Sequence, residues 1–176
     1  LNNLPSLKFL SISESQVDAL APLAAAAPNL VKLYANQINA RDAQSLAPLT
    51  QLEELTLIGN EVADLSFLAG MARLKFLNLG DNQIADVAPL TALNRLGSLS
   101  LHDNQITDLT PLAGLDRLEM LSLGGNGITS VAPLSALEDL RYLYLGRNQI
   151  VDAAPLSGLL RLYELDLAGN QIDSLA

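Results

Sequence analysis

Leucine recurs along this chain with a fixed period of 22 residues, and this regularity constrains the fold more than any other feature. The first leucine of the repeating unit stands at Leu30, Leu52, Leu74, Leu96, Leu118, Leu140 and Leu162, and Leu7 precedes the series by 23 residues. A second leucine follows three residues later in each unit, and another apolar residue follows two positions after that. One such unit is too short to bury its own apolar face, so the units are predicted to stack into a solenoid.

Each unit combines a strand with an irregular return. The LxL segment alternates with period two, which predicts a short strand with one buried face. An asparagine follows the strand, and its amide can donate to and accept from backbone groups that the turn leaves unpaired. We expect a ladder between coils made by Asn60, Asn82, Asn104, Asn126, Asn148 and Asn170. Proline in the second half of the unit prevents a long helix, so 3₁₀ turns or extended backbone are expected there.

The full unit, LxxLxLxxNxIxDLxPLxxLxx, resembles the leucine-rich repeat family over the whole chain. Its 22-residue spacing and DLxPL half are similar to the internalin type, which a regulatory protein of phosphatase 1 shares. The resemblance implies an α/β solenoid, a curved right-handed coil of about eight repeats. One parallel β-sheet would line the concave face, with short 3₁₀, irregular or extended segments on the convex face. Residues 1–176 are therefore expected to form a single leucine-rich repeat domain.

Two units depart from the pattern. In the second, the Asn-x-Ile triplet at 36–38 comes two residues early. One interpretation, which we favour, shortens the strand so that Asn36 joins the ladder. The other keeps the spacing and places Ile38 at the asparagine position. The first unit carries Ser15 at that position, where a hydroxyl can still reach backbone groups, and one extra residue in its return.

The two ends of the sequence predict an exposed core. LNNLPSL is similar to the tail of an earlier repeat, and NQIDSLA stops halfway through a return segment. Neither end has the polar cap that shields the last layer of a solenoid. We therefore expect a fragment of a longer protein that lacks both caps, and end-to-end self-association of the isolated chain.

Composition argues against several classes of partner and chemistry. The formal net charge is −9, from 19 acidic and 10 basic residues, which disfavours binding to nucleic-acid backbones. No apolar run reaches the roughly 18 residues that a membrane span needs, so no membrane insertion is expected. The chain has no cysteine, which removes disulfides and thiolate chemistry. We expect no metal and no cofactor.

Candidate catalytic residues are few. His102 is the single histidine, with Ser100 two residues away and Asp103 next to it. An aspartate adjacent in sequence is poorly placed to orient the imidazole, so an exposed strand residue is favoured over a catalytic triad, and no enzyme is expected. A further alternative is a hard cation held by Asp81, Asp103 and His102. Loop aspartates serve more often as turn residues.

Two other columns of charge follow the repeat. The aspartates Asp64, Asp86, Asp108 and Asp152 are expected to bond backbone in the convex turn. The arginines Arg73, Arg95, Arg117 and Arg161 precede the strands. This second pattern favours a solvated ladder of charge, with an acidic partner as the alternative.

The solvent-facing strand positions are the most informative surface. They hold five of the seven aromatic residues, and the inward strand positions hold none. Tyrosine and phenylalanine exposed on a rigid sheet are typical of binding anchors, because they offer large contact area at low entropic cost. The main predicted binding site comprises Met120, Tyr142, Tyr144, Arg147, Glu164 and Asp166. A weaker patch comprises Phe9, Lys32 and Tyr34, and Phe76 and His102 share the same face.

The family resemblance implies a module that binds a protein partner on its concave face, of an adhesin or receptor-recognition type. The alternative is an intracellular scaffold that binds an enzyme such as a phosphatase. A structural spacer or a designed repeat protein is less favoured, because the units are irregular. The compartment stays open between a bacterial secreted or cell-surface location, which we favour, and the cytoplasm.

Overall fold

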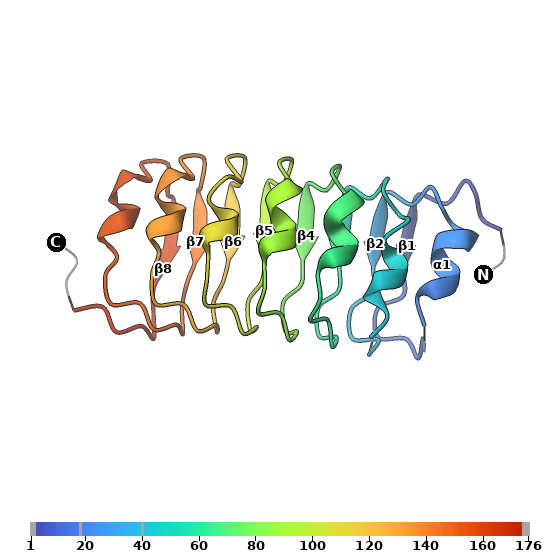
Figure 1. The fold of residues 1–176 in the computed structure, drawn as a ribbon, viewed down its shortest axis with the longest axis horizontal. Helices are drawn as coiled ribbons and strands as arrows, with labels where there is room; N and C mark the ends of the chain where they lie inside the picture. The colour runs from blue at the N-terminus through green and yellow to red at the C-terminus, as the bar shows by residue number, and fades with distance from the viewer. Residues whose placement is uncertain (1–2, 18, 40, 174–176) are drawn as a thin grey trace.

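A strand stands at the same place in each coil of the solenoid. The computed structural model describes residues 3–17, 19–39 and 41–173, which form one continuous row of coils (Figure 1). Each strand is three residues long. The strands are β1 (Phe9–Ser11), β2 (Lys32–Tyr34), β3 (Glu54–Thr56), β4 (Phe76–Asn78), β5 (Ser98–Ser100), β6 (Met120–Ser122), β7 (Tyr142–Tyr144) and β8 (Glu164–Asp166).

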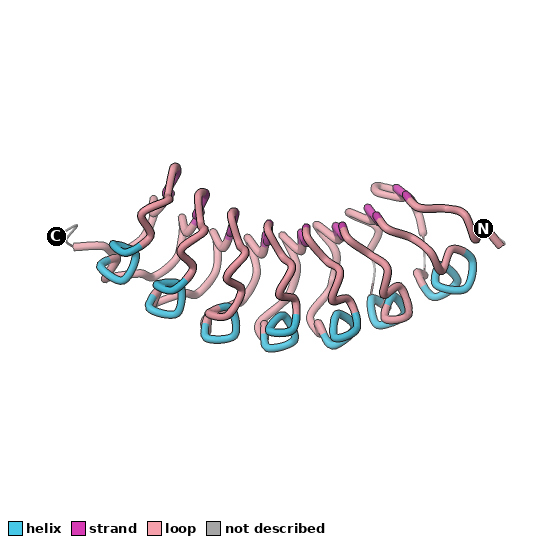
Figure 2. Tube along the Cα trace, turned by 90° about the horizontal axis from the view of Figure 1, so that it is seen from above, coloured by secondary structure: helices cyan, strands magenta, loops and turns pink. Residues whose placement is uncertain are grey.

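The strands form one parallel sheet in the order of the sequence, from β1 to β8. Each residue pairs with its equivalent in the next repeat, as Leu55 does with Leu77 and Leu121 with Leu143. The solenoid is curved, with the strands on the inner side of the arc and the helices on the outer side (Figure 2). The predicted fold, a solenoid with a parallel sheet on its concave face, is confirmed.

Short helices occupy the convex side. They are α1 (Ala21–Ala26), η1 (Ala43–Leu46), η2 (Ser66–Gly70), η3 (Ala88–Ala92), η4 (Thr110–Leu112), η5 (Ala132–Ala136) and η6 (Ala154–Gly158), where η denotes a 3₁₀ helix. Proline lies in the first turn of η3 to η6, where its missing N–H has no helical acceptor to lose. The α-helix in the first coil was not expected. The extra residue there lengthens an alanine-rich return, and alanine has the highest helix propensity.

The aspartate column supports these convex turns. Each carboxylate accepts a hydrogen bond at 2.8 Å from the backbone amide two residues later, as Asp86 does from Ala88. The same contact is made by Asp64, Asp108 and Asp152. Each bond satisfies an amide in the first turn of a 3₁₀ helix.

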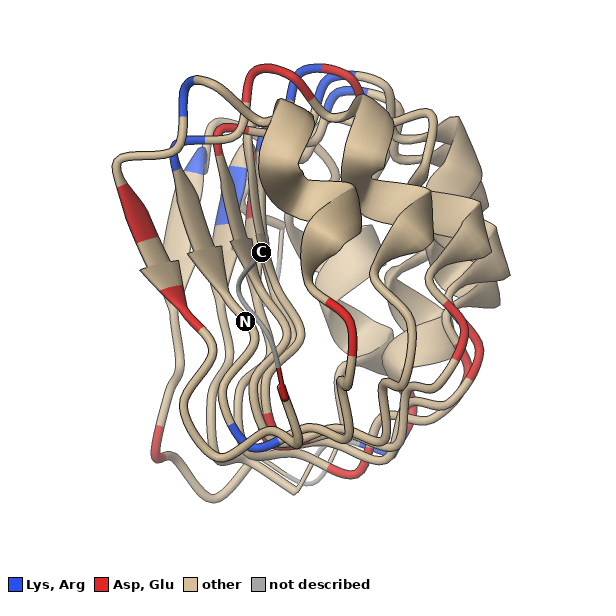
Figure 3. Ribbon diagram, turned by 90° about the vertical axis from the view of Figure 1, so that its left-hand side faces the viewer, with Lys and Arg blue, Asp and Glu red and all other residues tan. Residues whose placement is uncertain are grey.

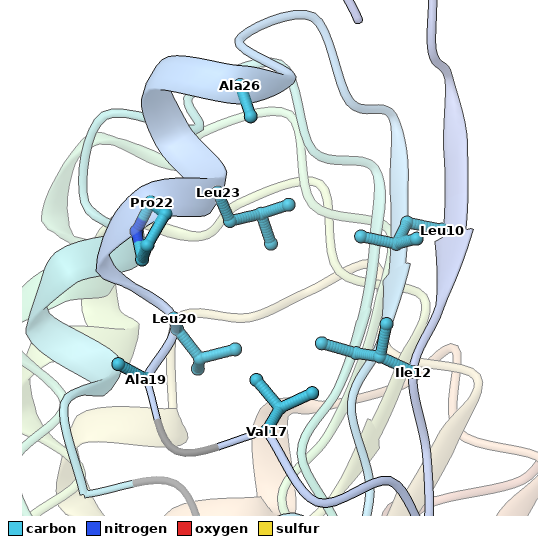
Figure 4. A pocket seen from close by; sticks show the side chains of 8 residues that line it. All are labelled: Leu10, Ile12, Val17, Ala19, Leu20, Pro22, Leu23 and Ala26. Atoms are coloured by element: carbon cyan, nitrogen blue, oxygen red, sulfur yellow. The ribbon is translucent and has the colours of Figure 1, made fainter. Parts of the chain in front are cut away.

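The core runs the length of the solenoid between sheet and helices. Its leucines are buried completely in the central coils, as Leu77, Leu99 and Leu121 are. The last coil is more open, since Leu165 is 42% exposed. At the first coil an apolar cleft of about 230 Å³ separates strand residues such as Leu10 from Leu23 of α1 (Figure 4).

The repeat asparagines join neighbouring coils. The amide nitrogen of each donates to a carbonyl in the preceding coil at 2.9–3.0 Å. The amide oxygen of each accepts from a backbone N–H of that same coil, as Asn104 does from Ile84 at 2.9 Å. These bonds pair backbone groups that the strand ladder leaves free, so each asparagine acts as a cross-coil brace.

A left-handed backbone residue precedes the asparagine position in every coil. This column comprises Glu14, Gln37, Gly59, Asp81, Asp103, Gly125, Arg147 and Gly169. A positive φ turns the chain sharply out of the strand, and it is uncommon for residues other than glycine. Its recurrence at a fixed distance from the strand defines the register of each coil.

The second coil follows this register without a gap. Gln37 has a φ of 51°, and its amide donates to Ile58 O at 2.8 Å, as Gly59 does to Gly80 O at 3.0 Å. Ile38 therefore occupies the asparagine position and is 4% exposed. The interpretation that shortened the strand is wrong, because the left-handed residue Gln37 places Ile38, and not Asn36, at the asparagine position. The isoleucine side chain is favoured at that position because it is buried in the core.

Asn36 is consequently not a ladder residue. Its amide oxygen accepts from Ile58 N of the following coil at 2.9 Å, whereas ladder asparagines bond the preceding coil. Asn60 supplies the brace instead, since its oxygen accepts from Ile38 N at 3.2 Å. In the first coil, Ser15 bonds the backbone only weakly, at 3.5 Å to Ser13 O.

Candidate functional site

The outward face of the sheet is the candidate site, because helices cover only its other face. Figure 3, viewed along the solenoid, shows the strands on one side and all the helices on the other. Acidic positions lie on the strand nearest the viewer, at the C-terminal end of the sheet (Figure 3). Parallel sheets are usually covered on both faces, whereas helices cover only one face of this sheet. The uncovered face is therefore available to a partner.

The residues predicted near the C-terminus come together as a patch on β6, β7 and β8. Met120, Tyr142 and Glu164 lie side by side in register. Ser122, Tyr144 and Asp166 form the adjacent row. We call Met120, Tyr142, Tyr144, Glu164 and Asp166, together with Tyr163, the C-terminal patch.

Tyr163 belongs to this patch although the sequence did not single it out. Its side chain is 83% exposed, and its ring meets that of Tyr142 edge to face at a centroid distance of 5.9 Å. Tyr163 lies one residue before the outward strand positions, at the place that Arg141 occupies in the preceding coil. An aromatic residue in a column that is otherwise mostly charged was the signal that could have revealed it.

The acidic edge of the patch influences Tyr144. Burial raises the pKa of the Tyr144 phenol, and a hydrogen bond to Glu164 raises it further. Asp166 accepts a hydrogen bond from Ala168 N at 2.9 Å, which fixes one of its carboxylate oxygens. The patch therefore combines exposed and half-buried tyrosine rings with two carboxylates on β8.

A second cluster lies on β1, β2 and β3. Phe9 and Tyr34 pack edge to face, with ring centroids 5.2 Å apart. The Glu54 carboxylate joins this cluster, because Lys32 and Tyr34 both contact it at 2.7 Å. We call Phe9, Lys32, Tyr34 and Glu54 the N-terminal patch. Glu54 was not among the residues predicted for this patch, which comprised Phe9, Lys32 and Tyr34.

The ionic contacts of this cluster shift its pKa values. Hydrogen bonds from Lys32 and then Tyr34 lower the pKa of Glu54. The contact with Glu54 raises the pKa of Lys32 and that of Tyr34. All three groups are thus mutually satisfied before any partner binds.

The centre of the face carries smaller and more polar residues. The His102 ring lies so close over Gly80 that a Cβ there would fall 2.2 Å from the ring nitrogen Nε2. Phe76 is half-buried on β4. These two residues lie between the two patches, whose central strands β2 and β7 are five strand spacings apart, about 24 Å at about 4.8 Å each.

Arg147 is at the edge of the sheet rather than in the C-terminal patch. Its guanidinium bonds Asp103 at 2.9 Å, two coils away, and the pair spans Gly125. His102 Nδ1 contacts the other oxygen of Asp103, also at 2.9 Å. Both carboxylate oxygens of Asp103 are therefore engaged by protein side chains. These contacts compete with the cation site that the sequence suggested for Asp103 and Asp81.

Catalytic geometry is not apparent at His102. Ser100 is 5% exposed, and the histidine bonds Asp103 rather than Ser100. Within the described part of the chain, no group of three histidine, aspartate or glutamate side chains is arranged to hold a metal ion. Over the same residues, no helix is long and apolar enough to cross a bilayer.

Comparison with known proteins agrees with this architecture. The sequence profile described as Leucine Rich repeats (2 copies) matches residues 72–114, 116–158 and 138–176, more than half of the chain. The chain therefore belongs to the leucine-rich repeat family, whose members generally mediate protein–protein interaction. No curated protein sequence matches it significantly.

The most similar solved structures include internalins. Internalin C2 of Listeria monocytogenes has a TM-score of 0.92 and 37% identity, over 96% of this chain and 74% of that one. The Listeria internalin InlF has a TM-score of 0.88 and 33% identity, over 96% of this chain and 49% of InlF. A leucine-rich repeat protein of Leptospira interrogans has a TM-score of 0.74 and 27% identity, over 97% of this chain and 45% of its own. The chain is thus internalin-like in both sequence and fold.

Proposed function

We propose that this domain is a recognition module that binds a protein partner on its concave face, through the C-terminal patch. The observation that carries the proposal is a cluster of three tyrosines at a sheet face that no helix covers: Tyr142 and Tyr163 are exposed, and Tyr144 beside them is half-buried. Exposed aromatic side chains on a rigid support are the residues most often found at the energetic centre of interfaces. Their positions on short, braced strands fix them before binding, which lowers the entropic cost of association.

Similarity to internalins favours an adhesin or receptor-recognition role over an intracellular scaffold. The relatives in question are described only as internalins, so the partner itself must be found by experiment. A scaffold that binds a cytoplasmic enzyme is the alternative outcome. The two predict partners from different compartments.

A capture experiment with matched variants tests the proposal. The wild-type domain would be immobilised beside Tyr142→Ala/Tyr144→Ala and a control, Thr129→Ala/Val151→Ala, whose two side chains are exposed on the return path. We expect partners retained by wild type and control to be lost by the tyrosine variant. Equal retention by all three proteins would contradict the proposal.

Folding of the variants is the necessary companion measurement. Both tyrosines lie on the outward face, while Leu143 between them is buried. Their truncation should therefore change the melting temperature by no more than about 2 °C, as expected for surface substitutions. A large fall would mean that the tyrosines hold the coil together and are not free to bind.

A further inference from the structure

The concave face carries the same tyrosine–glutamate pair twice. Tyr34 on β2 lies beside Glu54 on β3, and Tyr144 on β7 lies beside Glu164 on β8. In both cases the tyrosine ends its strand and the glutamate begins the next one. The two pairs are therefore equivalent by position, five coils apart.

The pair in the N-terminal patch is completed by a lysine. Lys32 Nζ lies 2.7 Å from one oxygen of Glu54, and the Tyr34 hydroxyl donates to the other oxygen at 2.7 Å. Both oxygens of the carboxylate are thus engaged by groups of the same chain. Charge-assisted hydrogen bonds are typically this short, although partial exposure of both side chains, 46% for Lys32 and 28% for Glu54, keeps the net contribution to stability small.

The pair in the C-terminal patch has no such lysine. Tyr142 stands at the position equivalent to Lys32, and its ring packs against Tyr163. Among the described residues, no cation forms an ion pair with Glu164, and the arginines that flank the patch pair elsewhere, Arg141 with Glu119 and Arg161 with Asp139. Asp166 adds a second carboxylate where the equivalent position of β3 is Thr56.

Building on the proposed function, we propose that the C-terminal patch binds a lysine or arginine side chain of the protein partner. The ammonium or guanidinium group of that side chain contacts Glu164 in the way that the Lys32 ammonium contacts Glu54. The N-terminal patch serves as an internal copy of the complex, in which the cation comes from the chain itself. This assigns the partner a basic residue at the acidic edge of the interface, beside an otherwise apolar segment that covers the tyrosines.

The surroundings of Glu164 suit the whole of such a side chain. The rings of Tyr142 and Tyr144 and the flexible Met120 offer apolar surface to the methylene stem. The same rings attract the cation through their negative faces. Asp166 places further negative charge beside the head group, so a lysine or arginine is favoured over an uncharged side chain of equal size.

A small probe tests this without knowledge of the partner. Nα-acetyl-lysine N-methylamide would be titrated into the protein, with the norleucine analogue as the uncharged control, and the tyrosine ring signals followed by NMR. We expect saturable shifts of the Tyr142 and Tyr144 signals at millimolar lysine probe and at least a tenfold weaker effect of norleucine. Equal effects of both probes, or none that saturates, would overturn the inference.

Three substitutions place the binding at the inferred carboxylate. Glu164→Gln keeps the shape of the side chain and should weaken lysine-probe binding at least tenfold. Tyr142→Lys copies the N-terminal arrangement, so its own ammonium should occupy Glu164 and exclude the probe. Lys32→Ala frees Glu54 and should create a second lysine site, detected as new shifts of the Tyr34 signal.

The pattern across these variants decides the matter. Unchanged probe binding in both Glu164→Gln and Tyr142→Lys overturns the inference, provided that their melting temperatures match that of wild type. If the probe binds as expected while no protein is captured through the tyrosines, the proposed function fails and the cation site stands. If a protein is captured through the tyrosines but its capture does not depend on Glu164, the proposed function stands and the cation site is overturned.

Discussion

Removal of one ladder asparagine should destabilise the solenoid by a measurable amount. In Asn104→Ala, the amide nitrogen that lies 3.0–3.1 Å from the carbonyls of Leu79, Leu101 and His102 is lost. The amide oxygen that accepts from Ile84 N at 2.9 Å is lost with it. The nitrogen carries only two hydrogens, so at most three of these four bonds are strong at once.

The magnitude follows from the backbone groups left without partners. Each buried N–H or C=O deprived of its hydrogen bond costs roughly 1–3 kcal/mol. With the Ile84 amide and at least one carbonyl affected, we expect a loss of about 3 kcal/mol in the free energy of unfolding. For a chain of this size that corresponds to a fall in melting temperature of roughly 6–12 °C.

Asn94→Ala is the matched control. Asn94 is an exposed asparagine for which no side-chain hydrogen bond is found among the described residues, so its truncation should change stability by less than about 0.5 kcal/mol. Urea denaturation followed by circular dichroism would compare both variants with wild type. If Asn104→Ala is as stable as Asn94→Ala, the ladder does not brace the coils and the reasoning is refuted.

Three further predictions concern the turns, the charges and the ends. Gly125→Ala should lower stability by about 1–3 kcal/mol, because its φ is +68° and a Cβ would lie 2.3 Å from a carboxylate oxygen, whereas Gly114→Ala, in open space, should not. The coupling between Lys32 and Glu54 in a double-mutant cycle should be small but present at pH 7. The pKa of Glu54 is lowered, so this coupling is fully present above the ordinary glutamate pKa of about 4.3 and should be lost as the pH falls below it and the carboxylate is protonated. A coupling that persists in acid would contradict the assignment. Leu160 and Leu165 are 90% and 42% exposed, so sedimentation should show concentration-dependent self-association that Leu165→Lys reduces. A monomer at all concentrations would contradict this prediction.

The sequence was sufficient to predict the repeating architecture. The leucine columns fall on the buried face of the strands, and a fixed period leaves one way to stack them in register. The positions of the outward-facing residues follow from the same alternation. The alternation alone therefore predicts that Tyr142 and Tyr144 lie on one face of β7.

Features that depend on several coils at once were harder to predict. The favoured register of the second coil was wrong, because its Asn-x-Ile triplet resembles that of the other repeats. In the structure Ile38 is buried, and Asn36 bonds the following coil, whereas a ladder asparagine bonds the preceding one. The contact between Lys32 and Glu54 involves side chains 22 residues apart whose rotamers a pattern does not specify. Tyr163 was missed because it lies outside the strict alternation of the strand.

Site-directed photocross-linking tests the central claim most directly. A photoreactive phenylalanine analogue at Met120, in the C-terminal patch, would be compared with the same analogue at Val151, exposed on the return path. The account predicts a partner cross-linked from Met120 and not from Val151, with the cross-link abolished by Tyr144→Ala. Cross-linking of the same partner from Val151 alone would show that recognition uses another surface and would contradict the account.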